Sequence, residues 1–331
     1  MKKVVFMLFV MVFSIRMVYG TENIYPMKEL IRPSVIVVGN ETIYIGDKTT
    51  IKLYNLKDCK FKKKIGRKGE GPGEFIGLAS PQIHPDFLLV SSVNKISYFS
   101  LTENLFKEKK HNLLGYKIKS IKDKFVGFEI KRGKDDFYVV YNLYDSNLKF
   151  IKELHRGKWL RHMKKKRDLF EIFFYDTCED KIVLAHRKDF IIDILDENGN
   201  VIHSIKQDYI PIPFTKRDKT AVIEYWRKNP PYKFAFDFIK KRTAFPKNYP
   251  PILTCKLDKN KIYVITYLKK NKKNECLIFD IDGKFLKKIF IPLYRKSPLE
   301  IDPFTIDRNY LFQLIENYEK EIWELHISEL K

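Results

Sequence analysis

The stretch NKIYVITYLKKNKKNECLIFDIDGKFLKKIFIP, residues 260–292, decides the fold. Two runs within it, 262–267 and 275–280, are rich in β-branched and aromatic residues, which is typical of strands. Asp282-Gly283 is a hairpin-turn pair, and a third run follows at 285–291. The stretch therefore predicts three antiparallel strands joined by short turns.

The same three-run plan recurs along the chain. Six copies can be traced, at 41–66, 86–110, 124–154, 180–205, 260–292 and 309–330. In the fourth copy, Asn198-Gly199 occupies the place of Asp282-Gly283. The first runs begin at 43, 88, 125, 182, 262 and 310, at spacings of 45, 37, 57, 80 and 48 residues. Apart from one long interval, these spacings agree with the roughly 40–50 residues of a propeller blade.

A fourth strand for each unit is available between the copies, for example in 34–39, 173–178 and 251–257. Four strands make a blade, so we expect an all-β chain folded as a six-bladed β-propeller. The short run after residue 20 is expected to close the ring by joining the blade of 309–330. A β-sandwich would not explain repetition with this period.

The segment GRKGEGPGEF at 66–75 resembles the G-x-x-G-x-G-P-G-E-F loop that joins blades in six-bladed propellers similar to the NHL-repeat family. The strand pattern I-Y-V, I-x-x-F-D and D-G-K-F-x-x-K-I, and FPKNYPPI at 245–252, resemble the same group. Many of its members are exported bacterial proteins, and they include binding platforms, sensors and a few lyases and lactonases. The resemblance therefore implies the fold without selecting a function.

A structural role between two blades is predicted for the glycine-rich loop itself. It lacks the Gly-Lys-Ser/Thr ending of a phosphate-binding loop, so we expect no nucleotide site. Glycines permit a positive φ, proline fixes a turn, and the final phenylalanine begins the next part of the core. The residues with these roles are Gly69, Gly71, Gly73, Pro72 and Phe75.

The long interval between the fourth and fifth copies, 206–250, is expected to be a partly helical insertion broken at Pro230-Pro231. An element inserted into a rigid propeller usually covers the face where the loops of several blades converge, so this insertion is the predicted specificity element. The candidate ligand contacts are Tyr225, Trp226, Arg227 and Tyr232. The alternative is that the aromatic residues pack the insertion onto the propeller.

The densest basic cluster is HRGKWLRHMKKKRDLF at 155–170. Basic groups beside an indole can hold an anionic glycan through charge pairing and stacking. Trp159 and Arg161 are therefore further candidate ligand contacts. The alternative is a solvated loop between blades, because runs of charge are commonly surface.

Residues 1–20 are typical of a signal peptide. Lys2 and Lys3 precede an uncharged apolar run, 4–15, that is too short to span a bilayer. Val18 and Gly20 suit a cleavage site, so residues 21–331 are expected to form a single propeller domain that is periplasmic or secreted. The cleavage region has no cysteine for a lipid anchor, and no later run has the length of a transmembrane segment.

The chain is strongly basic, with a net charge of +22 that becomes +19 once Lys2, Lys3 and Arg16 are removed with the leader. The lysines are spread along the whole sequence, which favours a solvated surface over one polyanion site. Anionic partners are the alternative, but nucleic acid is not expected, because the motifs of the usual nucleic-acid modules are missing.

Four cysteines, Cys59, Cys178, Cys255 and Cys276, are far apart and form no C-x-x-C pair. Zinc or redox chemistry is therefore not expected. Three disulfide pairings are open in an oxidising compartment, and buried free thiols are an equally reasonable outcome.

Neither H-E-x-x-H nor G-x-S-x-G occurs, and the seven histidines are scattered. We therefore expect no metal or cofactor and name no catalytic residue. The leading hypothesis is a non-catalytic binding module for an unknown protein, an anionic glycan or a small molecule. The alternatives are a lactonase- or lyase-like propeller enzyme with a metal site assembled across blades, and a structural role at the cell surface.

Overall fold

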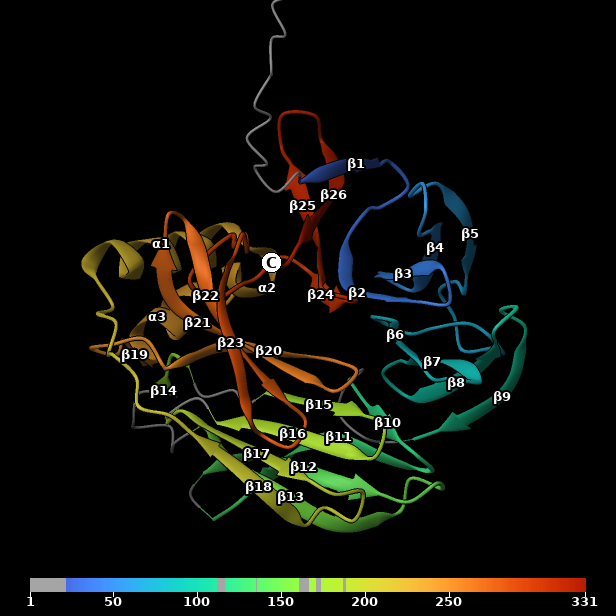
Figure 1. The fold of residues 1–331 in the computed structure, drawn as a ribbon, viewed down its shortest axis with the longest axis horizontal. Helices are drawn as coiled ribbons and strands as arrows, with labels where there is room; N and C mark the ends of the chain where they lie inside the picture. Colours follow the sequence, from blue (N-terminus) through green and yellow to red (C-terminus); the bar gives the residue numbers. More distant parts are fainter. Residues whose placement is uncertain (1–21, 112–116, 135, 161–166, 171–173, 187–188) are drawn as a thin grey trace, which may run out of the picture.

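The computed structural model describes residues 22–111, 117–134, 136–160, 167–170, 174–186 and 189–331. The strands in these ranges form six four-stranded antiparallel sheets, which are arranged radially (Figure 1). The predicted six-bladed β-propeller is therefore confirmed. We number the blades by their order along the chain after β1.

Each of the first three blades is a simple up-and-down meander. Blade 1 contains β2 (Pro33–Gly39), β3 (Thr42–Asp47), β4 (Thr50–Asn55) and β5 (Phe61–Ile65). Blade 2 contains β6 (Ser80–Ile83), β7 (Phe87–Ser91), β8 (Lys95–Ser100) and β9 (Leu105–Lys110). Blade 3 contains β10 (Lys119–Ile121), β11 (Lys124–Arg132), β12 (Phe137–Tyr144) and β13 (Phe150–Leu160).

The other three blades repeat this order, and the last one borrows a strand from the N-terminus. Blade 4 contains β15 (Phe174–Cys178), β16 (Lys181–His186), β17 (Ile191–Leu195) and β18 (Val201–Lys206). Blade 5 contains β20 (Ile252–Asp258), β21 (Lys261–Lys270), β22 (Lys273–Asp280) and β23 (Phe285–Ile291). Blade 6 contains β24 (Phe304–Asp307), β25 (Tyr310–Asn317), β26 (Ile322–Glu329) and β1 (Asn23–Met27).

The first strand of each blade lies nearest the centre of the ring (Figure 1). Neighbouring strands within a blade alternate in direction, so every connection from a fourth strand to the next blade's first strand leaves at the same end of the propeller. We call this end the upper face. It carries the glycine-rich loop 66–75, residues 167–170 of the basic segment and the insertion 206–250.

Apolar side chains from facing sheets fill the space between neighbouring blades. One cluster joins Ile192 and Ile194 of blade 4 to Ile262 and Val264 of blade 5. Burial of such strands on both faces explains the nearly continuous apolar runs that the sequence shows in β21 and β22.

The ring is closed by pairing between the two ends of the chain. β1 is antiparallel to β26, with Asn23 opposite Ile327 and Met27 opposite Trp323. Met27 is fully buried and shares a cluster with Trp323 of blade 6 and Ile43 of blade 1. The predicted closure by the short run after residue 20 is therefore observed.

Replacing Met27 by Ala should lower the free energy of unfolding by about 2–5 kcal/mol, because it opens a cavity at the joint between the first and last blades. Chemical denaturation measures this loss. Ile24→Ala changes the same strand at a side chain that is 51% exposed, and it should change stability by no more than about 0.5 kcal/mol. Equal effects of the two substitutions would contradict the assigned role of this joint.

Candidate functional site: the upper face and the axis

The insertion lies between β18 of blade 4 and β20 of blade 5 and contains α1 (Lys216–Lys228), α2 (Pro230–Lys233) and α3 (Phe236–Arg242). The predicted helical insertion between the fourth and fifth repeats is therefore confirmed. The α1 helix begins with a capping box, in which Thr215 and Asp218 satisfy each other's backbone N–H groups. It ends before Pro230, which is the break that the proline pair predicts.

Packing accounts for two of the aromatic residues that the sequence offers as ligand contacts. Trp226 is only 3% exposed, and its ring centroid lies 5.9 Å from that of Phe245. Tyr225 is half-buried and hydrogen-bonds Glu300; burial and that carboxylate both raise its pKa. The Tyr225 contact ties α1 to the segment between blades 5 and 6, and the Trp226 contact packs α1 within the insertion.

Of the other two candidates on the insertion, Tyr232 is half-buried, like Tyr225, and Arg227 lies at the surface. Arg227 is exposed and forms an ion pair with Glu224 on the same helix. The Tyr232 ring lies 5.7 Å from the Tyr225 ring, centroid to centroid. A role for any of these side chains in ligand binding stays a prediction.

The basic segment meets the insertion, a contact that the sequence did not predict. Its residues 155–160 continue β13 instead of forming a loop, so Trp159 stands on a strand, while Arg161 lies outside the described residues. Further along, β14 (Arg167–Asp168) pairs in parallel with β19 (Thr243–Ala244) at the end of the insertion. Phe170 then packs against Phe214 and Tyr249.

The glycine-rich loop is tied to blade 2. Gly73 has a φ of 70°, and its N–H donates to Glu108 at 3.1 Å. Glu74 accepts the N–H of Gly71 at 2.9 Å, while the Phe75 side chain is fully buried. Gly69 also has a positive φ, whereas Gly71, contrary to expectation, does not, and Pro72 lies between two of these glycines.

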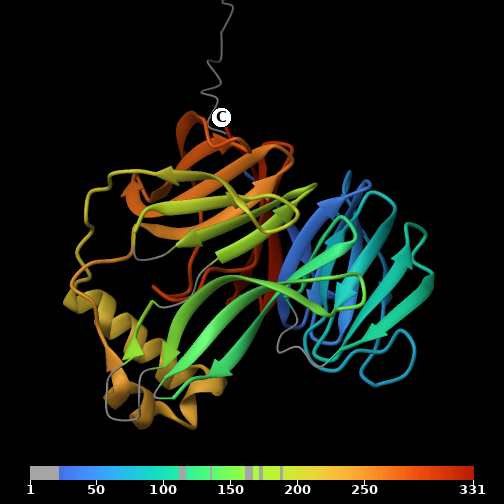
Figure 2. The ribbon, with the colours of Figure 1, turned by 90° about the horizontal axis from the view of Figure 1, so that it is seen from below.

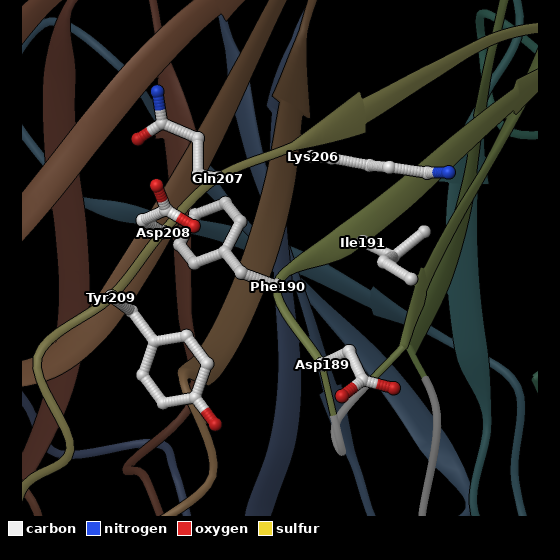
Figure 3. Close-up of a pocket in the computed structure, with 7 residues that line it drawn as sticks. All are labelled: Asp189, Phe190, Ile191, Lys206, Gln207, Asp208 and Tyr209. Carbon is white, nitrogen blue, oxygen red and sulfur yellow. The ribbon is translucent and has the colours of Figure 1, made fainter.

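A cleft lies where the two ends of the insertion leave blades 4 and 5. It consists of two adjoining hollows of about 390 and 220 Å³, which share Phe190 and the segment 207–209. Figure 3 shows the residues that line the first hollow. None of the four candidate residues on the insertion lines these hollows. The cleft carries charges of both signs, and Lys288 and Glu275 on its wall lie 3.8 Å apart. It therefore shows no preference for an anion.

A more distinctive arrangement lies at the axis. In three consecutive blades, Lys119 of β10, Asp176 of β15 and Lys256 of β20 occupy the same position, two residues before the last ladder pair of the strand. All three side chains are partly exposed. Because the first strands surround the axis, these side chains stand at one level of the ring.

Hydrogen bonds show how closely the first strands approach one another. Gln82 of β6 donates to Thr177 of β15 at 3.2 Å, although blade 3 lies between their blades. The backbone N–H of Ser120 on β10 donates to the Gln82 side chain at 2.8 Å. Polar groups of three blades are therefore fixed relative to one another beside the axis.

Positive charge is in excess there. The Asp176 carboxylate forms an ion pair with Lys119, with 3.0 Å between Oδ1 and Nζ. Within the described ranges, Lys256 forms no ion pair within 4.0 Å; its ammonium lies 4.9 Å from the centroid of the Phe304 ring. Burial and the like charges of Lys119 and Lys117 lower the pKa of Lys256 to about 8, and Asp176 opposes this shift. We call Lys117, Lys119, Asp176 and Lys256 the axial cluster.

The sequence contains a signal for this cluster, although no local motif marks it. Asp176 and Lys256 fall inside 173–178 and 251–257, which were predicted to supply the fourth strand of a blade. A charged residue in a largely apolar strand needs a partner or a function. Their convergence depends on the closure of the ring, which no local motif reports.

Comparison with known proteins supports the same architecture. Residues 28–167 match a family described as a 6-bladed beta-propeller. The protein is a six-bladed β-propeller. No curated protein matches its sequence.

One solved structure extends this likeness over nearly the whole chain. A Bacteroides fragilis protein named "putative exported protein" is 15% identical, with a TM-score of 0.54 over 94% of this chain and 96% of that one. A Bacteroides vulgatus member of the DUF4221 family is 12% identical, with a TM-score of 0.49 over the same shares of the two chains. The first of these likenesses supports the fold and no further property.

All four cysteines of the propeller are free thiols. Burial, as the largest cause, raises the pKa of Cys59 to about 11 and those of Cys178 and Cys276 to about 12. In the part of the chain that the structure describes, no group of three His, Cys, Asp or Glu side chains could hold a metal ion, and no helix is long and apolar enough to cross a membrane.

The electrostatics of the axial cluster can be tested by titrating Lys256. Its pKa should be about 8 in the folded protein. Lys119→Met should raise this pKa, because it removes a like charge and frees Asp176, whereas Asp176→Asn should lower it. NMR of ¹³C-labelled lysine side chains, with Lys256→Met to assign the signal, measures these values.

The same pKa fixes the sign of a pH dependence. Since the folded-state pKa lies below the ordinary value of about 10.4, the contribution of Lys256 to stability rises with pH between these two values. The effect of Lys256→Met on the free energy of unfolding should therefore be more stabilising at pH 7 than at pH 10. If Lys256 had an ordinary pKa that neither Lys119→Met nor Asp176→Asn changed, the electrostatic coupling within the axial cluster would be refuted.

Trp226→Ala should loosen the insertion rather than remove a ligand contact. Deleting a buried indole typically costs about 3–5 kcal/mol. Amide hydrogen exchange should therefore become faster along α1, while the blade strands keep their protection. Arg217→Ala, at an exposed position of the same helix, is the matched control and should leave exchange unchanged. Unchanged exchange in Trp226→Ala would show that the indole does not anchor α1.

Proposed function

We propose that this propeller is an exported, non-catalytic binding module that recognises an anionic group at the axial cluster. The observation that carries the proposal is the excess of three lysines over one carboxylate beside the axis. Residues 1–20, which are typical of a signal peptide, support the export part of the proposal.

The charges explain why an anion is the expected ligand. Burial lowers the pKa of Lys256, and Asp176, which is already paired with Lys119, opposes this shift only in part. A bound carboxylate or phosphate would lower the electrostatic energy of the protonated amine and accept hydrogen bonds from it. The lysine ammonium has three donors and no acceptor, so it favours anions over neutral ligands.

The position of Lys117 supports an approach from the upper face. It precedes β10, and the first strand of each blade starts at the upper face. Lys117 is exposed, whereas Lys119 and Lys256 further along the strands are partly exposed. An anion would thus meet the accessible lysine first and the partly buried pair next. An acidic sugar or another small molecule with a carboxylate fits this arrangement.

Binding of inorganic phosphate and of citrate, measured by calorimetry, tests the proposal. Lys119→Met/Lys256→Met should weaken the affinity by about tenfold or more, because hydrogen bonds to charged groups are lost. Lys284→Met/Lys287→Met removes the same charge from exposed positions around β23 and should change the affinity by less than about twofold.

If both double variants lost the same affinity for phosphate and citrate, anion binding would depend only on the net charge of the protein. That result, or wild-type protein that binds neither anion, would overturn the proposal. Thermal unfolding of each variant checks that the propeller remains folded.

A further inference from the structure

The outer part of the insertion has an unusual combination of side chains. Phe234 at the end of α2 is 96% exposed, and Phe238 of α3 is 60% exposed. No residue of α3 is buried. We call residues 227–242, which include α2 and α3, the insertion tip. Its large apolar side chains therefore contribute little to the core of the propeller.

The charge of the insertion tip is strongly one-sided. The segment 227–242 has one acidic residue, Asp237, and six basic ones, which are Arg227, Lys228, Lys233, Lys240, Lys241 and Arg242. Several of the cations lie over the aromatic rings. The Arg242 guanidinium is 5.1 Å from the Phe238 ring centroid, and that of Arg227 is 5.4 Å from the Phe236 ring centroid. Basic and aromatic groups are therefore interleaved over the same short helices.

The tip also stands away from the body of the propeller. The helices form a lobe beside the blades (Figure 2). Val222 and Trp226 of α1 are the buried residues of the lobe's longest helix, so α1 anchors the lobe. The α3 helix contacts α1 and α2 without burying a residue of its own. Basic and aromatic residues are therefore presented to a partner without any change in the fold.

We propose that the insertion tip docks the protein onto an anionic phospholipid surface. Basic groups are attracted to anionic headgroups, and exposed aromatic side chains enter the interface between headgroups and acyl chains. A side chain that is almost wholly exposed enters a deformable bilayer without a preformed pocket, whereas a protein partner would need one at each phenylalanine. The charge excess and the exposed rings together therefore favour a membrane surface over a protein.

Vesicle flotation tests this docking with the full chain, purified with the same N-terminus in every variant. Vesicles of equal parts phosphatidylglycerol and phosphatidylcholine should carry the protein upward, and pure phosphatidylcholine vesicles should carry much less. Phe234→Ser/Phe238→Ser should lower the partition coefficient by about tenfold or more, because the variant lacks the two aromatic side chains that the bilayer would bury. Phe106→Ser/Tyr318→Ser removes two exposed aromatic residues elsewhere and should leave the partition coefficient unchanged.

A second readout reports insertion directly. The fluorescence of Phe234→Trp should shift to the blue on the anionic vesicles and be quenched by brominated acyl chains. Lys240→Gln/Lys241→Gln should weaken partitioning and reduce its dependence on salt.

Two results would overturn the inference. One is equal partitioning of the Phe234→Ser/Phe238→Ser variant and wild type. The other is binding of the tip to soluble polyglutamate with no preference for anionic vesicles, which would favour an acidic protein partner. Because neither phenylalanine belongs to the axial cluster, failure here leaves the anion-binding proposal standing.

Discussion

The pairing of β1 with β26 is the constraint on which the rest of this structure depends. It joins residues about three hundred positions apart in the sequence. The buried Met27 packs in the cluster between the first and last blades. Each blade alone is a small sheet with an exposed edge, and only a closed ring gives every blade two neighbours. Closure therefore stabilises all six blades and fixes the distance of every first strand from the axis.

The axial cluster is a consequence of this closure. Lys119, Asp176 and Lys256 belong to different blades and are separated by 57 and 80 residues in the sequence. They meet because equivalent positions of consecutive first strands lie at one level of the ring. Burial is the main cause that lowers the pKa of Lys256; Asp176 opposes this shift, and the like charges of Lys119 and Lys117 add to it.

The upper face follows from the same topology. Every connection between blades leaves at this end, so chain length can be added there without disturbing the sheets. The insertion and the basic segment both use this freedom, and β14 pairs with β19 to join them. The insertion therefore has two parts with different surfaces, which are the anchored α1 helix and the exposed insertion tip.

Much of the fold could be predicted from the sequence because blade repeats are local patterns. The stretch 260–292 carries its strands and its Asp282-Gly283 turn within a few residues. The helical insertion was visible for the same reason, as an interruption of the period by a segment with helix breakers at Pro230-Pro231.

The candidate site was harder to predict. Trp226 stood out in the sequence as an aromatic residue in an insertion, yet burial against Phe245 accounts for its place. Lys256 did not stand out, because one lysine in a lysine-rich chain has no distinctive local pattern. Its environment is created by Lys119 and Asp176 in other blades, and the sequence gives no distance between residues of different blades.

The central claim is that ring closure creates a site for an anion among the axial lysines. A crystal of the protein soaked in bromide tests it most directly, because anomalous scattering locates the ion whatever the natural ligand is. The account predicts a bromide peak within hydrogen-bonding distance of the Lys256 or Lys119 ammonium, and its absence from crystals of Lys119→Met/Lys256→Met. Bromide found only at outer surface lysines, with the axis occupied by water, would contradict it.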